Sequence, residues 1–212
     1  MRTSGIKIII RLSAIFCLPF FTHAQSLPNQ LVSIKGGYSR HGSGDMKGIV
    51  FGAEYAKYAS RRISLNYYFN GSINNGIDRI FIHNGLTGNR QDASIRFTTA
   101  GVQAGMNGRF SFMRTKRNEL LISLGGFGRY QSASNGSDGY NLFYPSTTNV
   151  PTVLIEYDNK TPQKTYAFGG LLQLQYNFTF NSNILVGIAP GFQTDTNGDT
   201  LLQAVIIIGK RY

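Results

Sequence analysis

Apolar and polar residues alternate with a period of two along most of the chain beyond residue 25. In residues 166–178, one face carries aromatic residues, leucines and a glycine, and the other carries small residues, amides and one leucine. The same alternation recurs in 62–70 and 184–193. Successive side chains of a β-strand point to opposite faces, so this period predicts strands with one apolar face.

Eight segments show this pattern. They lie near residues 31–40, 47–58, 62–71, 94–112, 119–131, 164–180, 183–193 and 200–212. A strand that crosses a bilayer needs about 9–11 tilted residues, and these segments are long enough. The even number of strands and the β-rich composition predict an all-β fold, an eight-stranded antiparallel up-and-down transmembrane β-barrel.

The connections between the segments differ in length. Those near 59–61, 113–118 and 181–182 are short, whereas 72–93 and 132–163 are long and rich in Gly, Asn, Ser and Asp. Short turns on one side and longer loops on the other are typical of an outer-membrane barrel, with both ends of the chain on the periplasmic side.

Aromatic residues fall into two groups when the strands are laid side by side in this order. Near the outer rim lie Tyr38, Phe69, Tyr130, Tyr166, Phe168 and Phe192. Near the inner rim lie Tyr55, Phe110, Phe112, Tyr176, Phe178 and Tyr212. Two belts of amphipathic rings at the two water interfaces are expected of a membrane barrel.

The first residues have the features of a secretory signal peptide. Residues 1–24 begin with basic groups, continue with an apolar stretch and end on Thr22-His23-Ala24. We expect cleavage after Ala24, which leaves 25–212 as one outer-membrane β-barrel domain. The single cysteine, Cys17, would be discarded with the leader. Disulfides, thiol catalysis and cysteine-ligated metals are then excluded for the mature chain.

The formal charge of +11 raises the question of nucleic-acid binding. Eight basic residues lie at or beside the short turns, whereas most acidic residues lie in or beside the outer loops. The basic group comprises Lys57, Arg61, Arg62, Arg114, Lys116, Arg117, Lys210 and Arg211. Since these cations are split among turns and strands rather than forming one stripe, we expect no nucleic-acid partner.

The chain closes with an apolar strand that ends on an aromatic residue, Tyr212. Together with the eight strands, this resembles the small eight-stranded outer-membrane barrels common in Bacteroidetes. The resemblance implies a location in the cell outer membrane and contact with outer-membrane lipid and lipopolysaccharide. It also implies that Tyr212 serves as a terminal signal for the barrel assembly machinery. Lys210 departs from the apolar pattern, and a lysine at the rim can snorkel to the interface.

One ion pair is predicted inside the barrel. Pairing about the 41–46 connection places Glu54 opposite Ser33, so Lys35 should lie diagonally across from Glu54. Glu54 is the only acid expected deep inside a strand, and a partner would neutralise an otherwise costly buried charge. The alternative is that the two groups mark a proton or solute path.

Three motifs contain the residue types of a catalytic or metal site. His41 and Ser43 resemble the histidine and serine of barrel lipid A deacylases, but they lie in a Gly-rich turn near the start of the chain. His41 with Asp78 resembles the outer-loop groups of palmitoyl-transferring barrels, which also need an amphipathic helix that 25–30 cannot supply. His83 is expected to be a solvated loop residue.

The third motif is the segment 195–199. Its oxygen ligands alternate as at the start of a calcium loop, but it lacks the expected glycine and the bidentate glutamate. Asn197-Gly198 favours a hairpin turn instead. We therefore predict no catalytic, cofactor-binding or metal-binding residues. Within the preceding strand, Pro190 predicts either an earlier strand end or a bend at the rim.

The pattern favours a non-enzymatic outer-membrane barrel whose loops 72–93 and 132–163 have structural, adhesive or partner-binding roles. Loops on a rigid scaffold commonly carry function. The loop 132–163 is apolar enough that we expect it to fold on the barrel mouth or to bind something apolar. The alternatives are a narrow conduit for small solutes, an outer-leaflet lipid A acyl-modifying enzyme, or a soluble secreted barrel with a ligand cavity.

Overall fold

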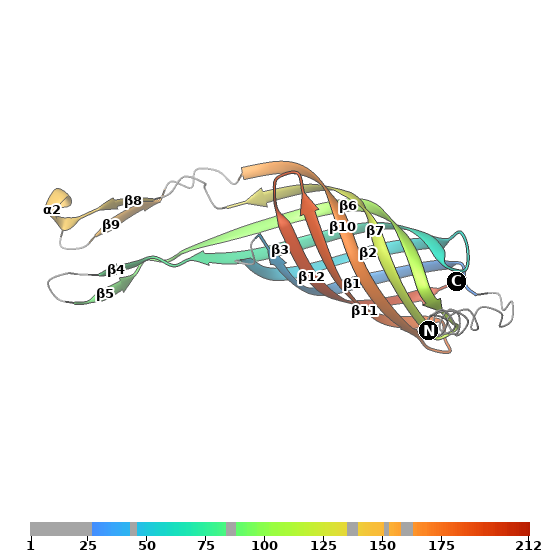
Figure 1. Ribbon diagram of the computed structural model, residues 1–212. Helices are drawn as coiled ribbons and strands as arrows, with labels where there is room; N and C mark the ends of the chain where they lie inside the picture. The colour runs from blue at the N-terminus through green and yellow to red at the C-terminus, as the bar shows by residue number, and fades with distance from the viewer. Residues whose placement is uncertain (1–26, 43–45, 84–87, 135–139, 151–152, 158–162) are drawn as a thin grey trace, which may run out of the picture.

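The chain forms a closed barrel of eight antiparallel strands (Figure 1). The computed structural model describes residues 27–42, 46–83, 88–134, 140–150, 153–157 and 163–212, so the predicted leader lies outside the described residues. The barrel strands are β1 (Gln30–His41), β2 (Met46–Tyr58), β3 (Ile63–Asp78), β6 (Ile95–Arg114), β7 (Asn118–Ala133), β10 (Gln163–Thr179), β11 (Ile184–Asp195) and β12 (Thr200–Arg211). The predicted fold class is confirmed, and all eight predicted strands are present.

Closure of the barrel depends on the pairing of β1 with β12. The ladder runs from Leu31 opposite Arg211 to His41 opposite Leu201. It continues one step further, because the Tyr212 amide donates to the Gln30 carbonyl at 3.0 Å. Every other strand pairs with its neighbours along the barrel sequence, so the wall has no free edge.

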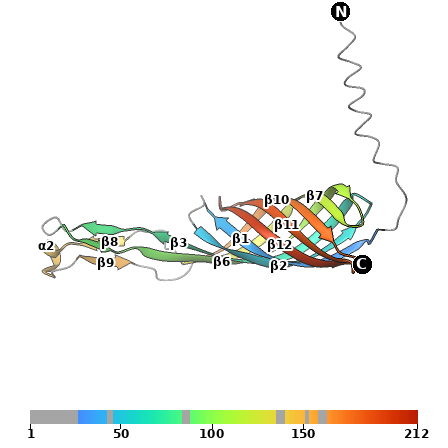
Figure 2. The ribbon, with the colours of Figure 1, turned by 90° about the horizontal axis from the view of Figure 1, so that it is seen from below.

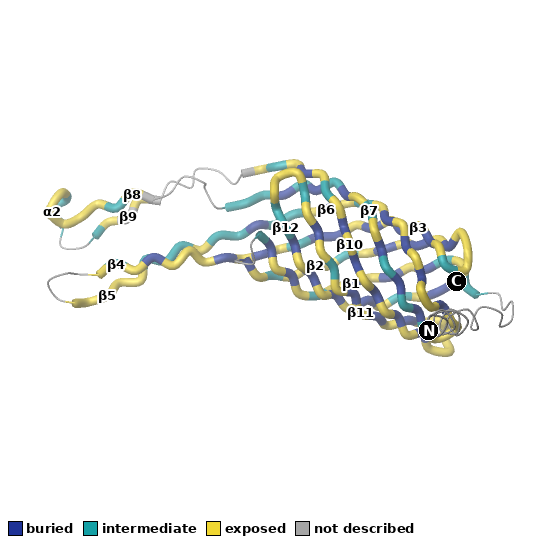
Figure 3. The backbone as a smooth tube through the Cα atoms, in the orientation of Figure 1, coloured by how far each residue is buried: buried dark blue, intermediate teal, exposed yellow. Residues whose placement is uncertain are grey.

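Side chains alternate between the two faces of the wall, as Figure 3 shows by the alternation of buried and exposed residues along each strand. The outward face is apolar and aromatic, and the residues of both predicted aromatic belts except the half-buried Tyr130 are exposed there. The inward face is mostly polar and includes buried Lys, Arg, Glu, Gln and Asn side chains. This is the reverse of a soluble fold and is what a lipid-facing wall requires.

Two local irregularities alter single strands. The register of β6 against β7 shifts between Ser111 and Met113, so Phe112 and Met113 are both exposed and Arg114 turns inward. This β-bulge changes the direction of one cationic side chain, that of Arg114. β11 runs through Pro190 to Asp195, so an early strand end there is wrong. Because proline has no N–H, the ladder with β10 is interrupted beside it, while the register on either side is unchanged.

The long outer connections contain more regular structure than the Gly- and Asn-rich sequence predicts. The expected strand 62–71 is extended to Asp78, and Asn75 to Asp78 pair with β6 beyond the ends of most other strands. The range 72–93 also contains the paired strands β4 (Phe81–His83) and β5 (Arg90–Asp92), which belong to a hairpin. The range 132–163 contains β8 (Tyr140–Phe143), α2 (Pro145–Thr148) and β9 (Leu154–Tyr157).

Both hairpins project beyond the barrel (Figures 1 and 2). The β8–β9 hairpin therefore does not fold over the barrel mouth, which was one of the two expectations for the loop 132–163. Among the residues that the structure describes, no helix is long and apolar enough to cross a membrane.

Neighbouring glycines 36 and 37 provide a test of the tightly packed wall. A Cβ on Gly37 would collide with the backbone of Ala204 and Val205, whereas a Cβ on Gly36 would meet nothing within 4 Å. We predict that Gly37→Ala destabilises the folded barrel by about 1–3 kcal/mol, the usual cost of overpacking. Gly36→Ala is the control and should fold as the wild type does. The measurement is the folded fraction as a function of urea concentration, read from heat-dependent gel mobility. Equal urea midpoints for the two variants would contradict the register of β1 against β12.

Candidate functional site

The barrel interior contains three clusters of charged side chains. We name them by position: the base cluster lies at the end with the turns at 59–62 and 180–183, the mouth cluster at the end with the hairpins, and the middle cluster between them. Each contains a buried carboxylate bonded to one or more buried cations. Buried charges of this kind persist only when they are paired and hydrogen-bonded.

The middle cluster brings together Lys35, Glu54 and Arg109. Lys35 Nζ lies 2.6 Å from Glu54 Oε1, and Arg109 Nη2 donates to Glu54 Oε2 at 2.5 Å. None of these side chains is more than 1% exposed. The register puts Glu54 opposite Ser33, which sets Lys35 diagonally across from it. The sequence did not predict Arg109 at this site. Strand register predicts contacts only between adjacent strands, and β6 is not adjacent to β1 or β2.

The base cluster is centred on Glu119, which is fully buried. Its carboxylate accepts hydrogen bonds from Arg211 Nη2 at 2.6 Å, Ser111 Oγ at 2.7 Å and Tyr58 OH at 2.9 Å. Arg114, turned inward by the bulge, lies 3.6 Å from the same carboxylate, and its guanidinium carbon is 3.4 Å from the centroid of the Tyr58 ring. Arg114 and Arg211, which were expected at the short turns, therefore lie inside the lumen and close this end of it.

The mouth cluster is organised by Arg129. Its guanidinium donates to Gln193 Oε1 at 2.6 Å, to Gln103 Oε1 at 2.9 Å and to Asp195 Oδ2 at 3.0 Å. Beside it, His41 Nε2 lies 3.7 Å from Asp199 Oδ2, and His41 is only 3% exposed. These groups fill the outer end of the lumen from several strands.

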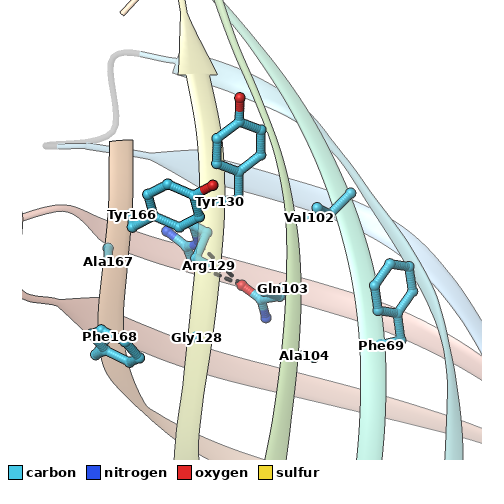
Figure 4. A pocket seen from close by; sticks show the side chains of 10 residues that line it. All are labelled: Phe69, Val102, Gln103, Ala104, Gly128, Arg129, Tyr130, Tyr166, Ala167 and Phe168. Atoms are coloured by element: carbon cyan, nitrogen blue, oxygen red, sulfur yellow. Dashed lines mark hydrogen bonds between the residues drawn. The ribbon is translucent and has the colours of Figure 1, made fainter. Parts of the chain in front are cut away.

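A shallow groove of about 260 Å³ lies on the outer wall near the mouth (Figure 4). In one row of paired residues, Ala104 and Gly128 form its floor, and Phe69 and Phe168 stand on either side. One row nearer the mouth, Tyr130 and Tyr166 pack with ring centroids 4.9 Å apart. The groove is mostly apolar and belongs to the lipid-facing surface rather than to the lumen.

Within the part of the chain that the structure describes, the other candidate residues do not come together. His41 points into the lumen toward Asp199, while Asp78 is exposed at the end of β3. Ser43 lies outside the described residues. His83 is exposed in the β4–β5 hairpin.

The segment 195–199 forms the predicted hairpin. Gly198 adopts φ +80°, and the Asn197 amide donates to Asp195 Oδ1 at 3.0 Å. Among the described residues, no group of three or more His, Cys, Asp or Glu side chains could hold a metal ion.

Tyr212 lies where β12 meets the start of β1. Its carbonyl accepts from the Asn29 amide at 2.8 Å, and its ring is exposed on the outward face. Lys210 Nζ lies 5.2 Å from the centroid of that ring, so the lysine that breaks the apolar pattern sits beside an aromatic at the rim.

No protein-family model and no curated protein matches the chain in sequence. Solved structures match it in shape. The N-terminal β-barrel domain of Pseudomonas aeruginosa OprF superposes with a TM-score of 0.53 at 9% identity, covering 88% of this chain and 100% of that domain. Ail, the attachment invasion locus protein of Yersinia pestis, superposes with a TM-score of 0.50 at 9% identity, with the same coverage of each chain. The chain therefore has the fold of the small eight-stranded outer-membrane barrels, and its apolar wall agrees with that location.

Glu119 offers a test of how far the folded barrel depends on its buried charges. We predict that Glu119→Gln destabilises the barrel by about 3–5 kcal/mol, because it leaves Arg211 and Arg114 buried without a counter-charge. Glu156→Gln on the exposed face of β9 is the control and should change stability by less than about 0.5 kcal/mol. Urea unfolding in lipid vesicles, read by circular dichroism, gives both values. A loss below that of the control would show that the base cluster contributes little.

Proposed function

We propose that the protein is a non-enzymatic integral barrel of the outer membrane whose outer hairpins bind a protein partner in the cell envelope. The single observation that carries this proposal is the pair of hairpins beyond the barrel, one of which exposes apolar side chains. The finer assignment to the barrels common in Bacteroidetes rests on the sequence features alone. The exposed ring of Tyr212, beside the junction of β12 and β1, supports its role as a signal for the assembly machinery.

The outward wall supports a membrane location. On the described barrel strands, exposed charges occur only near the two ends, and apart from Asp78 at the outer end of β3 they are cations. Near the mouth they are Arg40, Lys47, Arg96 and Lys164, and near the base they are Lys57 and Lys210. The rows between them are uncharged, and charged groups facing lipid at mid-depth would be destabilising.

The β8–β9 hairpin supports the partner-binding role. It consists of two four-residue strands, and Phe143, Tyr144 and Leu154 are 39%, 54% and 44% exposed at its far end. An isolated two-stranded hairpin is marginally stable in water. Clustered exposed aromatic and aliphatic groups also mark interaction surfaces. Contact with an apolar surface of a partner would bury these side chains and would also stabilise the hairpin.

The β4–β5 hairpin offers a second, more polar contact surface. Arg90 lies over the Phe81 ring, with its guanidinium carbon 3.4 Å from the ring centroid. The hairpin is closed at its base, where the Ala93 amide donates to the Ile80 carbonyl at 2.9 Å. Arginine and aromatic residues are enriched at the centres of protein interfaces.

The interior argues against the two alternative functions. A solute conduit would need a continuous passage, but paired side chains of the base, middle and mouth clusters cross the lumen at three levels. An eight-stranded barrel is just wide enough for such side chains to fill. A lipid A acyl-modifying enzyme would need its histidine directed toward lipid, whereas His41 faces the lumen.

Cations at the outer rim support lipopolysaccharide as a lipid partner. Arg40 and Lys47 lie directly opposite each other on β1 and β2, and both are exposed. Like charges in such a cross-strand pair repel each other, so an anion between them would relieve the repulsion. The phosphate groups of lipopolysaccharide in the outer leaflet supply that charge at the same level of the wall.

We predict that Arg40→Gln with Lys47→Gln reduces lipopolysaccharide retention roughly tenfold or more, since each cation near an anionic surface contributes about 1 kcal/mol. Lipid A that copurifies in mild detergent, quantified by mass spectrometry, is the measurement. The control is Lys57→Gln with Lys210→Gln, which removes the same charge from the base. Equal loss in both double variants would assign the effect to net charge and contradict a site at the mouth.

The partner-binding proposal is tested by crosslinking in intact envelopes. We expect proteins crosslinked to the β8–β9 hairpin to be lost when Phe143, Tyr144 and Leu154 are all replaced by Ser, because the apolar contact is removed. Replacement of the exposed Asn141 by Ser and Glu156 by Gln on the same hairpin is the control and should leave the crosslinks intact. If the wild-type hairpin captures no protein, or the triple variant captures the same proteins, the proposal is wrong.

A further inference from the structure

The middle cluster carries more positive than negative charge. Lys35 and Arg109 both bond to Glu54, which is the only carboxylate within 4 Å of either among the described residues. Both cations are buried. Two cations and one carboxylate leave a surplus of one positive charge in the middle of the lumen. An uncompensated buried charge is strongly unfavourable, so the folded barrel needs a further negative charge there.

Arg109 also has unused hydrogen-bond donors. Only Nη2 is bonded to Glu54, whereas Nε and Nη1 are buried and have no hydrogen-bond partner among the described residues. These two nitrogens carry three N–H groups, and a guanidinium in proteins does not give up its proton. The surplus charge and the unused donors thus meet on the same side chain.

Further unused donors surround the base of Arg109. Ser64 on β3 and Ser123 on β7 lie directly opposite Arg109 in the two neighbouring ladders, and Gln173 on β10 lies opposite Ser123. Both hydroxyls and the amide of Gln173 are buried without a hydrogen-bond partner. This row of the inward wall therefore presents O–H and N–H groups to the lumen beside a guanidinium.

We infer that the lumen holds one small monovalent anion of the halide type against Nε and Nη1 of Arg109. A single negative charge cancels the surplus of the middle cluster, whereas a divalent oxyanion would reverse it. The ligands are a guanidinium and neutral donors, which suit an anion and not a metal cation. The base and mouth clusters separate this position from both ends of the lumen, so the anion is acquired during folding and is retained as part of the core.

The first test locates the anion directly. The full barrel is refolded from urea in sodium bromide, crystallised from bromide, and examined by anomalous diffraction at the bromine edge. The expected result is an anomalous peak within hydrogen-bond distance of Arg109 Nε or Nη1. Absence of anomalous density in the lumen, with the Arg109 side chain well defined, would overturn the inference.

The second test measures the dependence of stability on halide at constant ionic strength. Thermal unfolding midpoints are compared in sodium bromide and in sodium gluconate, whose anion is much larger than bromide. The wild-type midpoint should rise with bromide concentration. Lys35→Met removes the surplus charge and should abolish that rise, whereas Glu54→Gln increases the surplus and should lower the bromide concentration at half effect by tenfold or more.

The matched control is Lys57→Met, which removes an exposed cation at the base and should keep the wild-type bromide dependence. If a lumen variant does not fold, the anomalous experiment on the wild-type barrel still decides the matter. Equal wild-type midpoints in bromide and gluconate would overturn the inference. So would an undiminished bromide effect in Lys35→Met, because the anion would then not be balancing the middle cluster.

Discussion

Satisfaction of the backbone inside the wall is the constraint on which the rest of this structure depends. Lipid offers no hydrogen bonds, so every N–H and C=O group at membrane depth must find a partner within the sheet. The β1–β12 ladder meets this demand by joining the first barrel strand to the last. Once the sheet is closed, each side chain points either outward to lipid or inward to the lumen. Between the two rims the outward face then becomes apolar, and most of the polar side chains turn into the lumen.

Confinement of polar groups explains the composition of the lumen. Its charges come from strands distant in sequence, as when Arg211 and Tyr58 both reach Glu119. These bonds tie opposite parts of the wall together across the barrel, which backbone pairing between neighbours cannot do. The bulge in β6 adds to them by directing Arg114 inward, at the cost of one irregular step in the ladder.

Much of this architecture could be predicted from the sequence, because two faces of opposite polarity leave a clear period of two. Pairing arithmetic across one short connection also put Lys35 beside Glu54, as the structure has them. The same arithmetic could not reach Arg109, which meets Glu54 across the lumen rather than along a ladder. The inward turn of Arg114 depends on a one-residue shift that no alternation shows. The extension of β3 to Asp78 was hidden by Asn and Gly, which are common in loops and here take part in a ladder.

The separation of the β8–β9 hairpin from the barrel has a consequence for how such a protein can change over generations. The ladder between β7 and β10 already reaches Ala133 and Gln163, below the hairpin. Substitutions in the hairpin therefore leave the hydrogen bonds of the wall intact. New hairpin sequences can therefore arise without a penalty in the folding of the wall, and the same independence makes this position suitable for the insertion of foreign peptides.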